Sequence, residues 1–302
     1  MANILVSGLI NLETTLKVEG FPINYNPVNY PFFGVNSAIS GVGFNLAKAL
    51  TVLGDSVAFL SLIGQDPAAE LVRLALDRAG IQGNRVLASL PATCQSVILY
   101  DGSGRRQIYT DLKDVQQQVY PIEAFEAAAQ VSDTLALCNI NFSRPMLQKA
   151  CQAGKRIATD LHTLSDLEDE YNRDFMAAAD ILFMSDERLP VAPEEWVRRI
   201  WNRYKAEIVV IGLGAQGALL GIRSQRQMVR FPAVYTRPIV STIGAGDALF
   251  SAFLHSYLHN ENPELALQKA IVFASYKIGE TSAAEGFLNA SSLEDWIQKT
   301  MG

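Results

Sequence analysis

The sequence predicts an α/β protein: a three-layer α/β/α sandwich with a mainly parallel central sheet and a small inserted β-sheet lid. Three observations support this prediction. Short β-branched runs alternate with amphipathic helical segments along most of the chain, as in a parallel sheet covered by helices on both faces. Residues 14–39 and 94–112 break the alternation and have strand patterns instead. No repeat or linker divides the chain, so we expect a single domain, residues 1–302, with lid strands inserted at about 14–39 and 94–112.

The first half of the chain begins with a buried strand at residues 3–7, which stops at a turn. Residues 14–39 are rich in Pro, Asn and aromatic residues and have an extended alternation without helical period. A helix is expected from Ser40 to Gly54, because leucines form one stripe and glycine is a common helix stop. A strand at 56–64, a helix at 67–80 and the hairpin of residues 94–112 complete this half.

Helix and strand patterns alternate again in the second half. In chain order they are helix 121–130, strand 134–140, helix 143–154, strand 155–160, strand 179–185, helix 193–204, strand 206–212 and the strand pair 217–223 and 227–232. Helices dominate from Gly244 to the end. Repeated strand–helix units of this kind predict the parallel sheet.

The composition excludes several classes of protein. A hydrophobic fraction of 49% and a charged fraction of 19% describe a globular chain. The net charge of −6 argues against a nucleic-acid binder. The three cysteines form neither a metal-ligand pattern nor a disulfide framework, and we expect them to be buried. No signal peptide or membrane span is visible, so we expect a cytoplasmic protein without a membrane partner.

The clearest chemical signal is Gly244-Ala245-Gly246-Asp247, followed by an apolar helix. Small residues let the backbone come close to a ligand, and the amides of a first helical turn bind anions well. Asp247 lies within reach of such an anion, where its carboxylate can take a proton from an attacking hydroxyl. Taken alone, these residues also fit a tight turn with an acidic residue in a first helical turn.

With its helix, this motif resembles the carboxy-terminal signature of the ribokinase-like (PfkB) carbohydrate kinase family. Residues 40–72, beginning Ser40-Gly41-Val42-Gly43-Phe44-Asn45, are similar to the family's amino-terminal signature. Both signatures occur in the expected order, and the alternation and the two insertions match as well. The resemblance covers essentially the whole chain. It implies an ATP-dependent phosphotransferase that phosphorylates a hydroxyl of a sugar or sugar-like small molecule.

The resemblance also implies roles for single positions. Asp247 would be the general base. Gly244, Ala245 and Gly246 would form the anion hole. The residues expected to bind the acceptor are Asn11, Glu13, Gly41, Gly43, Asn45 and Asn141. Asn141 stands where ribokinases carry an acidic contact, and an amide donates as well as accepts, so the hydroxyl pattern that it reads should differ.

Residues 212–217, Gly-Leu-Gly-Ala-Gln-Gly, match the dinucleotide fingerprint G-x-G-x-x-G. That fingerprint requires a helix next, whereas a strand pattern follows here, so we reject a dinucleotide site. The resemblance implies that this loop passes close to ATP instead. The nucleotide contacts it implies are Ser185, Gly212, Leu213, Gly214, Gln216 and Gly217.

Three departures from the family pattern concern cofactors and substrate. Ser185 and Arg188 replace the Asn and Glu of a motif tied to Mg²⁺ and phosphate, which leaves Asp186 and Glu187 as candidate metal contacts through water. We expect ATP and Mg²⁺ to be required. Ser241 stands where many members have an Asp that helps to bind a monovalent cation, which weakens the case for K⁺ activation. Residues 40–42 differ from the Gly-Gly-Lys of ribokinases, so ribose is not the expected acceptor.

Two other functions remain open at this level. A nucleoside kinase of the same fold would need an aromatic wall for the base. Tyr25, Tyr30, Phe32 and Phe33 could form that wall, although packing of the small sheet is the simpler interpretation. A non-catalytic ligand-binding descendant would explain the changes at residues 185–188 and Ser241, but a pure binder does not need Asp247.

Some remaining residues have two possible interpretations. His255 and His259 stand four residues apart on a late helix and could bind a metal. Because they share no ligand spacing with an acidic cluster, we interpret them as surface or packing residues. Arg105 and Arg106 at the hairpin tip are expected to be solvated or to contact an anionic substrate. The inserted strands could also join two copies as a homodimer through the lid.

Overall fold

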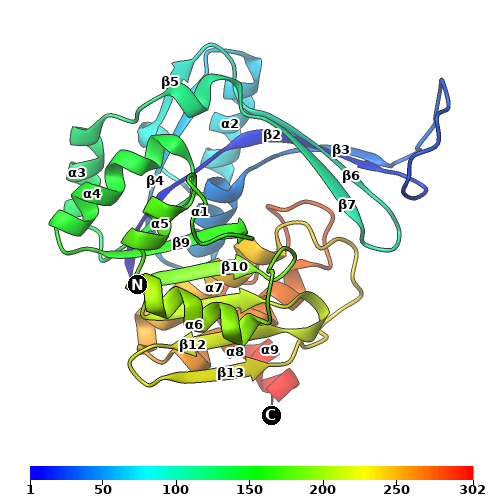
Figure 1. Ribbon diagram of the computed structural model, residues 1–302. Coiled ribbons are helices and arrows are strands. Elements are labelled where there is room, and N and C mark those ends of the chain that lie inside the picture. Colours follow the sequence, from blue (N-terminus) through cyan, green and yellow to red (C-terminus); the bar gives the residue numbers. More distant parts are fainter. Residues whose placement is uncertain (302) are drawn as a thin grey trace.

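A nine-stranded sheet runs through the centre of the protein (Figure 1). The structure, a computed structural model, describes residues 1–301, and Gly302 of the predicted domain lies outside this range. The strand order across the sheet is β13 (Gln227–Phe231), β12 (Ala218–Ile222), β11 (Ile208–Gly212), β10 (Ile181–Ser185), β9 (Arg156–Thr163), β8 (Thr134–Leu137), β1 (Asn3–Ser7), β4 (Ser56–Gly64) and β5 (Val86–Leu90). The pairs from β11 to β5 are parallel, and β12 and β13 form an antiparallel edge. The predicted mainly parallel sheet is confirmed.

Helices cover both faces of this sheet. One face carries α1 (Val42–Val52), α2 (Pro67–Arg78), α7 (Ala245–Asn260), α8 (Pro263–Lys277) and α9 (Ala290–Met301). The other face carries α3 (Ile122–Gln130), α4 (Arg144–Gln152), α5 (Arg173–Ala178) and α6 (Pro193–Arg203). Short 3₁₀ turns are η1 (Gly83–Arg85), η2 (Lys113–Gln117), η3 (Asn141–Ser143) and η4 (Gly214–Gln216). The three-layer sandwich is therefore confirmed, although the patterns had not indicated β5 or α5.

The central strands explain why the main sheet has a hydrophobic core on each of its faces. Successive side chains of a strand point to opposite faces of its sheet. In β1, Ile4 and Val6 belong to one core and Leu5 belongs to the other. The middle of such a strand is continuously apolar because both faces are covered, which is the pattern that identified these strands in the sequence.

A separate four-stranded sheet extends from the body and is made by the two predicted insertions (Figure 1). Its order is β3 (Val35–Ser40), β2 (Asn11–Lys17), β6 (Gln95–Tyr100) and β7 (Arg106–Asp111). The extended pattern predicted through residues 14–39 is partly wrong, since residues 18–34 form neither strand nor helix. Ser40 ends β3, and α1 begins only at Val42.

Two expectations about burial were also wrong. Tyr25, Tyr30, Phe32 and Phe33 do not pack on the small sheet, because all four side chains are exposed in the loop at its tip. Cys94 and Cys138 are buried as expected, but Cys151 on α4 is exposed. Within residues 1–301 no helix has the length and apolar character needed to cross a membrane.

Candidate active site

The carboxyl end of β1 lies where the connections of the main sheet diverge. β1 pairs with β4 on one side and with β8 on the other, and the chain builds the sheet outward in both directions from there. In open α/β sheets, ligands bind at the crevice formed at such a switch point. The residues after β1 continue into β2 of the small sheet, which joins this crevice to the lid.

The loop before α7 is shaped by Gly244. This residue is the helix N-cap and has a left-handed backbone, with φ 75°. A Cβ atom built there would lie 2.8 Å from the carbonyl oxygen of Ala283, so glycine is needed for both the conformation and the space. The amide of Ala245 donates to Thr242 within the turn at 3.2 Å. The amides of Gly246 and Asp247 belong to the first helical turn, which has no carbonyl partners within the helix and favours an anion.

Asp247 is held in position by Asn45. The Asn45 side-chain amide donates to Asp247 Oδ2 at 2.7 Å, and its oxygen accepts from the Ser40 hydroxyl at 3.3 Å. Burial raises the pKa of the Asp247 carboxyl above its ordinary value. The Asn45 hydrogen bond opposes this rise, as does the charge of Lys277, whereas the charge of Asp160 adds to it. A carboxylate with a raised pKa is a better proton acceptor near neutral pH.

The glycines at the start of α1 explain how Asn45 reaches Asp247. Gly41 has φ 103°, and a Cβ atom there would lie 2.6 Å from the carbonyl oxygen of Leu9. At Gly43 a Cβ atom would lie 2.4 Å from the carbonyl carbon of Gly8. Both glycines therefore let α1 begin directly against the loop that follows β1. Larger residues would displace the first turn of α1 and with it Asn45.

One face of β2 carries three buried polar side chains at alternate positions. Asn11 donates to the Ser96 hydroxyl at 3.0 Å, but its Oδ1 has no hydrogen-bond partner, and the same is true of Glu13 Oε1 and Thr15 Oγ1. Burial raises the pKa of Glu13, a hydrogen bond with Ser40 opposes this, and the Asp247 charge adds to the rise. Buried polar atoms normally have partners, so this row of two acceptor oxygens and one hydroxyl without partners fits the binding of a ligand rich in hydroxyl groups.

The structure adds two charged residues that the sequence interpretation missed. Asp160, near the end of β9, is only 6% exposed. A Cβ atom on Gly246 would lie 3.8 Å from its Oδ2. Lys277, the last residue of α8, is 0% exposed. A lysine at the end of the apolar second half of α8 and an aspartate near the end of a buried strand were the available signals.

Lys277 contacts the loop that precedes α7. Its ammonium donates to the carbonyl oxygen of Ile243, and burial lowers its pKa to about 8 against the attraction of Asp247 and Glu13. In a planar trans peptide the C=O and N–H groups point in opposite directions. The contact therefore fixes the peptide between Ile243 and Gly244 with the Gly244 N–H pointing away from Lys277.

The glycine-rich loop lies at the end of the sheet beside the predicted nucleotide residue of β10. Ser185 and Gly212 are direct neighbours in the parallel pair of β10 and β11. At Gly217, where φ is 95°, a Cβ atom would lie 2.0 Å from the carbonyl oxygen of Phe231. Gly214 and Gln216 lie in η4, and a strand follows, as predicted, instead of the helix of a dinucleotide site.

The remaining predicted residues have contacts of their own. Glu187 is exposed and pairs with Arg106 of the lid at 3.3 Å. Arg106 also donates to the Thr242 hydroxyl at 3.0 Å, so this side chain is not simply solvated. The side chain of Asn141 bonds to the Gln116 carbonyl at 3.0 Å and accepts from Arg144 at 3.3 Å. These contacts join it to neighbouring turns and not to Asp247.

Comparison with known proteins places these features in a family context. The family profile described as pfkB family carbohydrate kinase matches residues 1–290. An acarbose 7(IV)-phosphotransferase from Actinoplanes sp. is 25% identical over 296 residues, 96% of this chain and 97% of that protein. An ATP-dependent ribose-1-phosphate kinase from Halopiger xanaduensis is 25% identical, covering 94% of both chains. Among solved structures, a microbiome-derived acarbose kinase has the same fold, with a TM-score of 0.87 and 24% identity over 98% of this chain and 99% of that one.

Proposed function

The chain belongs to the pfkB family of carbohydrate kinases, and on that premise we propose that it transfers the γ-phosphate of ATP to a hydroxyl of a sugar or sugar-like molecule. The observation that carries this proposal is the carboxylate of Asp247 in the first turn of α7, oriented by Asn45 at 2.7 Å. A base and a set of anion-binding amides on the same helical turn meet the two needs of phosphoryl transfer.

In the proposed reaction Asp247 takes the proton of the acceptor hydroxyl while the hydroxyl oxygen bonds to the γ-phosphorus of ATP, and the bond from this phosphorus to the β,γ-bridging oxygen breaks to release ADP. The amides of Gly244 and Gly246 stabilise the negative charge on the transferred group, assisted by the dipole of α7. Lys277 holds the peptide that carries the Gly244 amide and is a positioning residue. Most of the rate enhancement then comes from orientation and fixed charge, as is general for this reaction class.

The proposal includes ATP and Mg²⁺ as required partners. Ser185, Asp186 and Glu187 offer hard oxygen donors, the type that Mg²⁺ prefers, and Mg²⁺ usually keeps several waters between itself and the protein. Magnesium held near these residues would neutralise phosphate charge. Glu187 is paired with Arg106 in this structure, so binding there requires that ion pair to open or to be shared.

A monovalent cation is not required in this proposal. Ser241 provides no carboxylate to hold such an ion, and the ammonium of Lys277 already donates to a carbonyl of the anion-hole loop. A covalently attached cation of this kind performs the positioning that a free ion would otherwise perform. We therefore propose turnover that is independent of added K⁺.

The acceptor is proposed to be a polyhydroxylated sugar or sugar-like alcohol. The unpartnered atoms on Asn11, Glu13 and Thr15 support this class, and so do the relatives that act on acarbose and ribose-1-phosphate. Gly41 and Asn45 complete the proposed pocket from the side of α1, and Gly43 contributes by close packing. The exposed aromatic side chains at the tip of the small sheet form no wall for a base, which argues against the nucleoside alternative.

The small sheet is proposed to act as a lid over this pocket and as a dimerisation surface. Arg106 already joins β7 to Thr242 and Glu187, which would let the lid close on bound substrates and exclude water. Large apolar side chains are exposed on the lid and its tip, among them Phe33, Ile108 and Tyr109. Pairing of two lids would cover them. Because the proposed reaction consumes ATP, we also propose that the protein acts in the cytoplasm.

The experiment is ADP release with MgATP across hexoses, pentoses, sugar acids, oligosaccharides and nucleosides. We expect release with at least one sugar and its loss by about 10²–10⁴-fold in Asp247→Asn, the usual contribution of a general base. ATP binding by this variant is measured separately by calorimetry. Turnover with nucleosides alone would show that the acceptor is a nucleoside and not a sugar. Near-normal turnover of Asp247→Asn would show that Asp247 is not the general base.

A further inference from the structure

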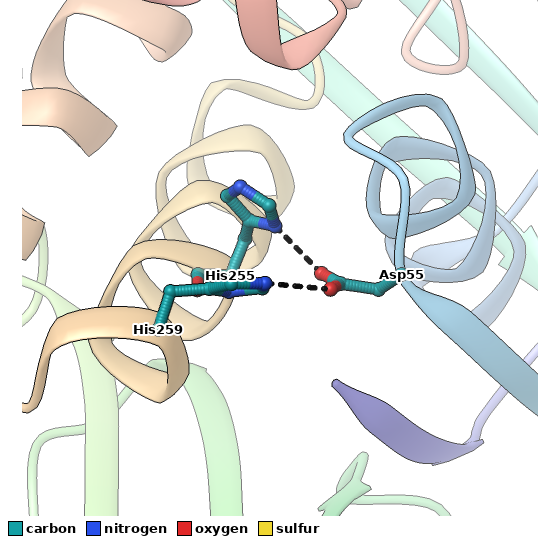
Figure 2. Close-up of side chains that lie close together, drawn as sticks. All are labelled: Asp55, His255 and His259. Atoms are coloured by element: carbon teal, nitrogen blue, oxygen red, sulfur yellow. Dashed lines mark hydrogen bonds and ion pairs between the residues drawn. The ribbon is translucent and has the colours of Figure 1, made fainter. Parts of the chain in front are cut away.

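Three side chains that commonly bind metals meet at the far end of α7 from Asp247 (Figure 2). His255 and His259 extend from the last turns of α7 toward Asp55, which immediately precedes β4. One potential ligand atom of each residue lies within 4.8 Å of those of the other two. We propose that Asp55, His255 and His259 bind a late first-row transition-metal ion such as Zn²⁺.

The carboxylate is buried and fixed. The side chain of Asp55 is 0% exposed, and its Oδ2 lies 2.7 Å from His255 Nδ1. Its Oδ1 accepts from the backbone amide of Ala2 at 3.1 Å. A buried carboxylate needs positive charge or several donors around it, and metal-ligating carboxylates are typically held by such outer hydrogen bonds. Asp55 is thus a preformed anionic ligand.

The orientation of His259 provides an independent argument. Its Nδ1 lies 2.7 Å from the carbonyl oxygen of His255. A carbonyl oxygen only accepts, so Nδ1 carries the hydrogen, and Nε2 is the nitrogen left to bind a metal ion through its lone pair. That lone pair faces Asp55 Oδ1 at 3.7 Å. A metal ion between Nε2 and this carboxylate would bind both, and a histidine fixed by a carbonyl on its other nitrogen is the usual arrangement at metal centres.

The donor set selects the type of ion. Two imidazoles and one carboxylate suit Zn²⁺ and its neighbours, whereas Mg²⁺ and Ca²⁺ prefer oxygen donors only. Zinc bonds of about 2.0–2.1 Å in a tetrahedron place neighbouring ligand atoms about 3.3 Å apart. His255 Nδ1 lies 2.7 Å from Asp55 Oδ2, below this value, and His259 Nε2 lies 3.7 Å from the other oxygen, Oδ1, above it. The three ligand atoms, all within 4.8 Å of one another, would approach this spacing by rotation of the side chains.

The fourth ligand can be water. His259 and Glu261 line an open cavity of about 1050 Å³, so solvent reaches the proposed site from the side of His259. A bound ion would tie the last turns of α7 to the segment between α1 and β4. Because it binds only the folded chain, it would also raise the free energy of unfolding.

The test uses the full chain without a histidine tag, after a chelator has removed any bound metal. The probe is ZnCl₂, and excess MgCl₂ is present. Calorimetry measures stoichiometry and affinity, and the visible spectrum with Co²⁺ reports the coordination number. The variants are His259→Gln, which removes a partly exposed ligand, and His255→Gln. The control is His162→Gln, because the chain has three histidines and His162 is the one outside the proposed site. Thermal unfolding of each metal-free variant checks that it is folded.

We expect one zinc ion per chain, a rise in Tm on zinc addition, and an affinity lowered at least about 10–100-fold in both α7 variants, since loss of an outer-shell partner alone costs that much. His162→Gln should bind zinc like the wild type. Equal binding by folded His259→Gln and wild type would overturn the proposal. So would loss of binding in His162→Gln alone, because the ion would then lie near Asp160.

Discussion

Replacing Lys277 by methionine separates the charge of this side chain from its volume. Methionine is unbranched and fills a similar space, so α8 should keep its packing. The variant loses the ammonium that donates to the carbonyl of Ile243. A hydrogen bond to a charged group contributes about 1.5–3 kcal/mol, and loss of one anion-hole donor costs about 10²–10³ in kcat. We expect kcat to fall within that range, since the Gly244 amide loses its support.

The assay is steady-state ADP release at saturating ATP and acceptor, with thermal unfolding to confirm the fold. Lys269→Met is the matched control, because Lys269 lies on the same helix and pairs with Glu294 at the surface. Ammonium or K⁺ ions should restore part of the activity of Lys277→Ala, whereas the wild type should not respond to them. A folded Lys277→Met variant with kcat within about threefold of wild type, a difference below 1 kcal/mol, would refute the positioning role.

The pH profile provides a second readout of the same residue. Burial lowers the pKa of Lys277 to about 8, with Asp247, Glu13 and Glu280 opposing the shift and Arg237 assisting it. The ammonium form is the active one, so kcat should decrease as pH rises through about 8, and this decrease should be absent from Lys277→Met. Stability should change in the opposite sense. Above the folded-state pKa the unfolded chain binds more protons than the folded chain, so the free energy of unfolding rises with pH until lysine also titrates in the unfolded chain.

Three further predictions test the pocket, the loop and the lid. Glu13→Gln should raise KM for the acceptor by about 10-fold or more, while KM for ATP changes little, because a charged hydrogen bond to substrate is lost; equal effects on both KM values would contradict its assignment to the acceptor. Gly244→Ala should lower kcat strongly, since its Cβ would lie 2.8 Å from a carbonyl oxygen. The control is Gly154→Ala, which is also at positive φ but has nothing within 4 Å of its Cβ. This control should lower only the free energy of unfolding, by about 1–2 kcal/mol. Phe33→Glu should shift the molecular mass measured by light scattering from that of a dimer to that of a monomer. An unchanged mass would show that the lid tip takes no part in dimerisation.

Much of the architecture could be predicted from local pattern. Runs such as Ile4 to Val6 are continuously apolar because both faces of the sheet are covered, so they identify a buried parallel sheet without any knowledge of distant contacts. Gly244 to Asp247 could be recognised for a similar reason, since the backbone of a tight loop and the first turn of its helix are determined by neighbouring residues. Residues 18–34 were misjudged, because extended alternation in sequence does not ensure a pairing partner.

Tertiary structure alone decided which charges meet. Asn45 reaches Asp247 across 202 positions, and Lys277 reaches Ile243 because α8 packs against α7. Asp55 reaches His255 across 200 positions, so no ligand spacing could have connected the two. Sequence periodicity records the face that each element buries, whereas the order of strands and the packing of helices set the distances between residues remote in the chain. The sequence thus determined the fold and the position of the proposed base, and the packing determined the charges around it.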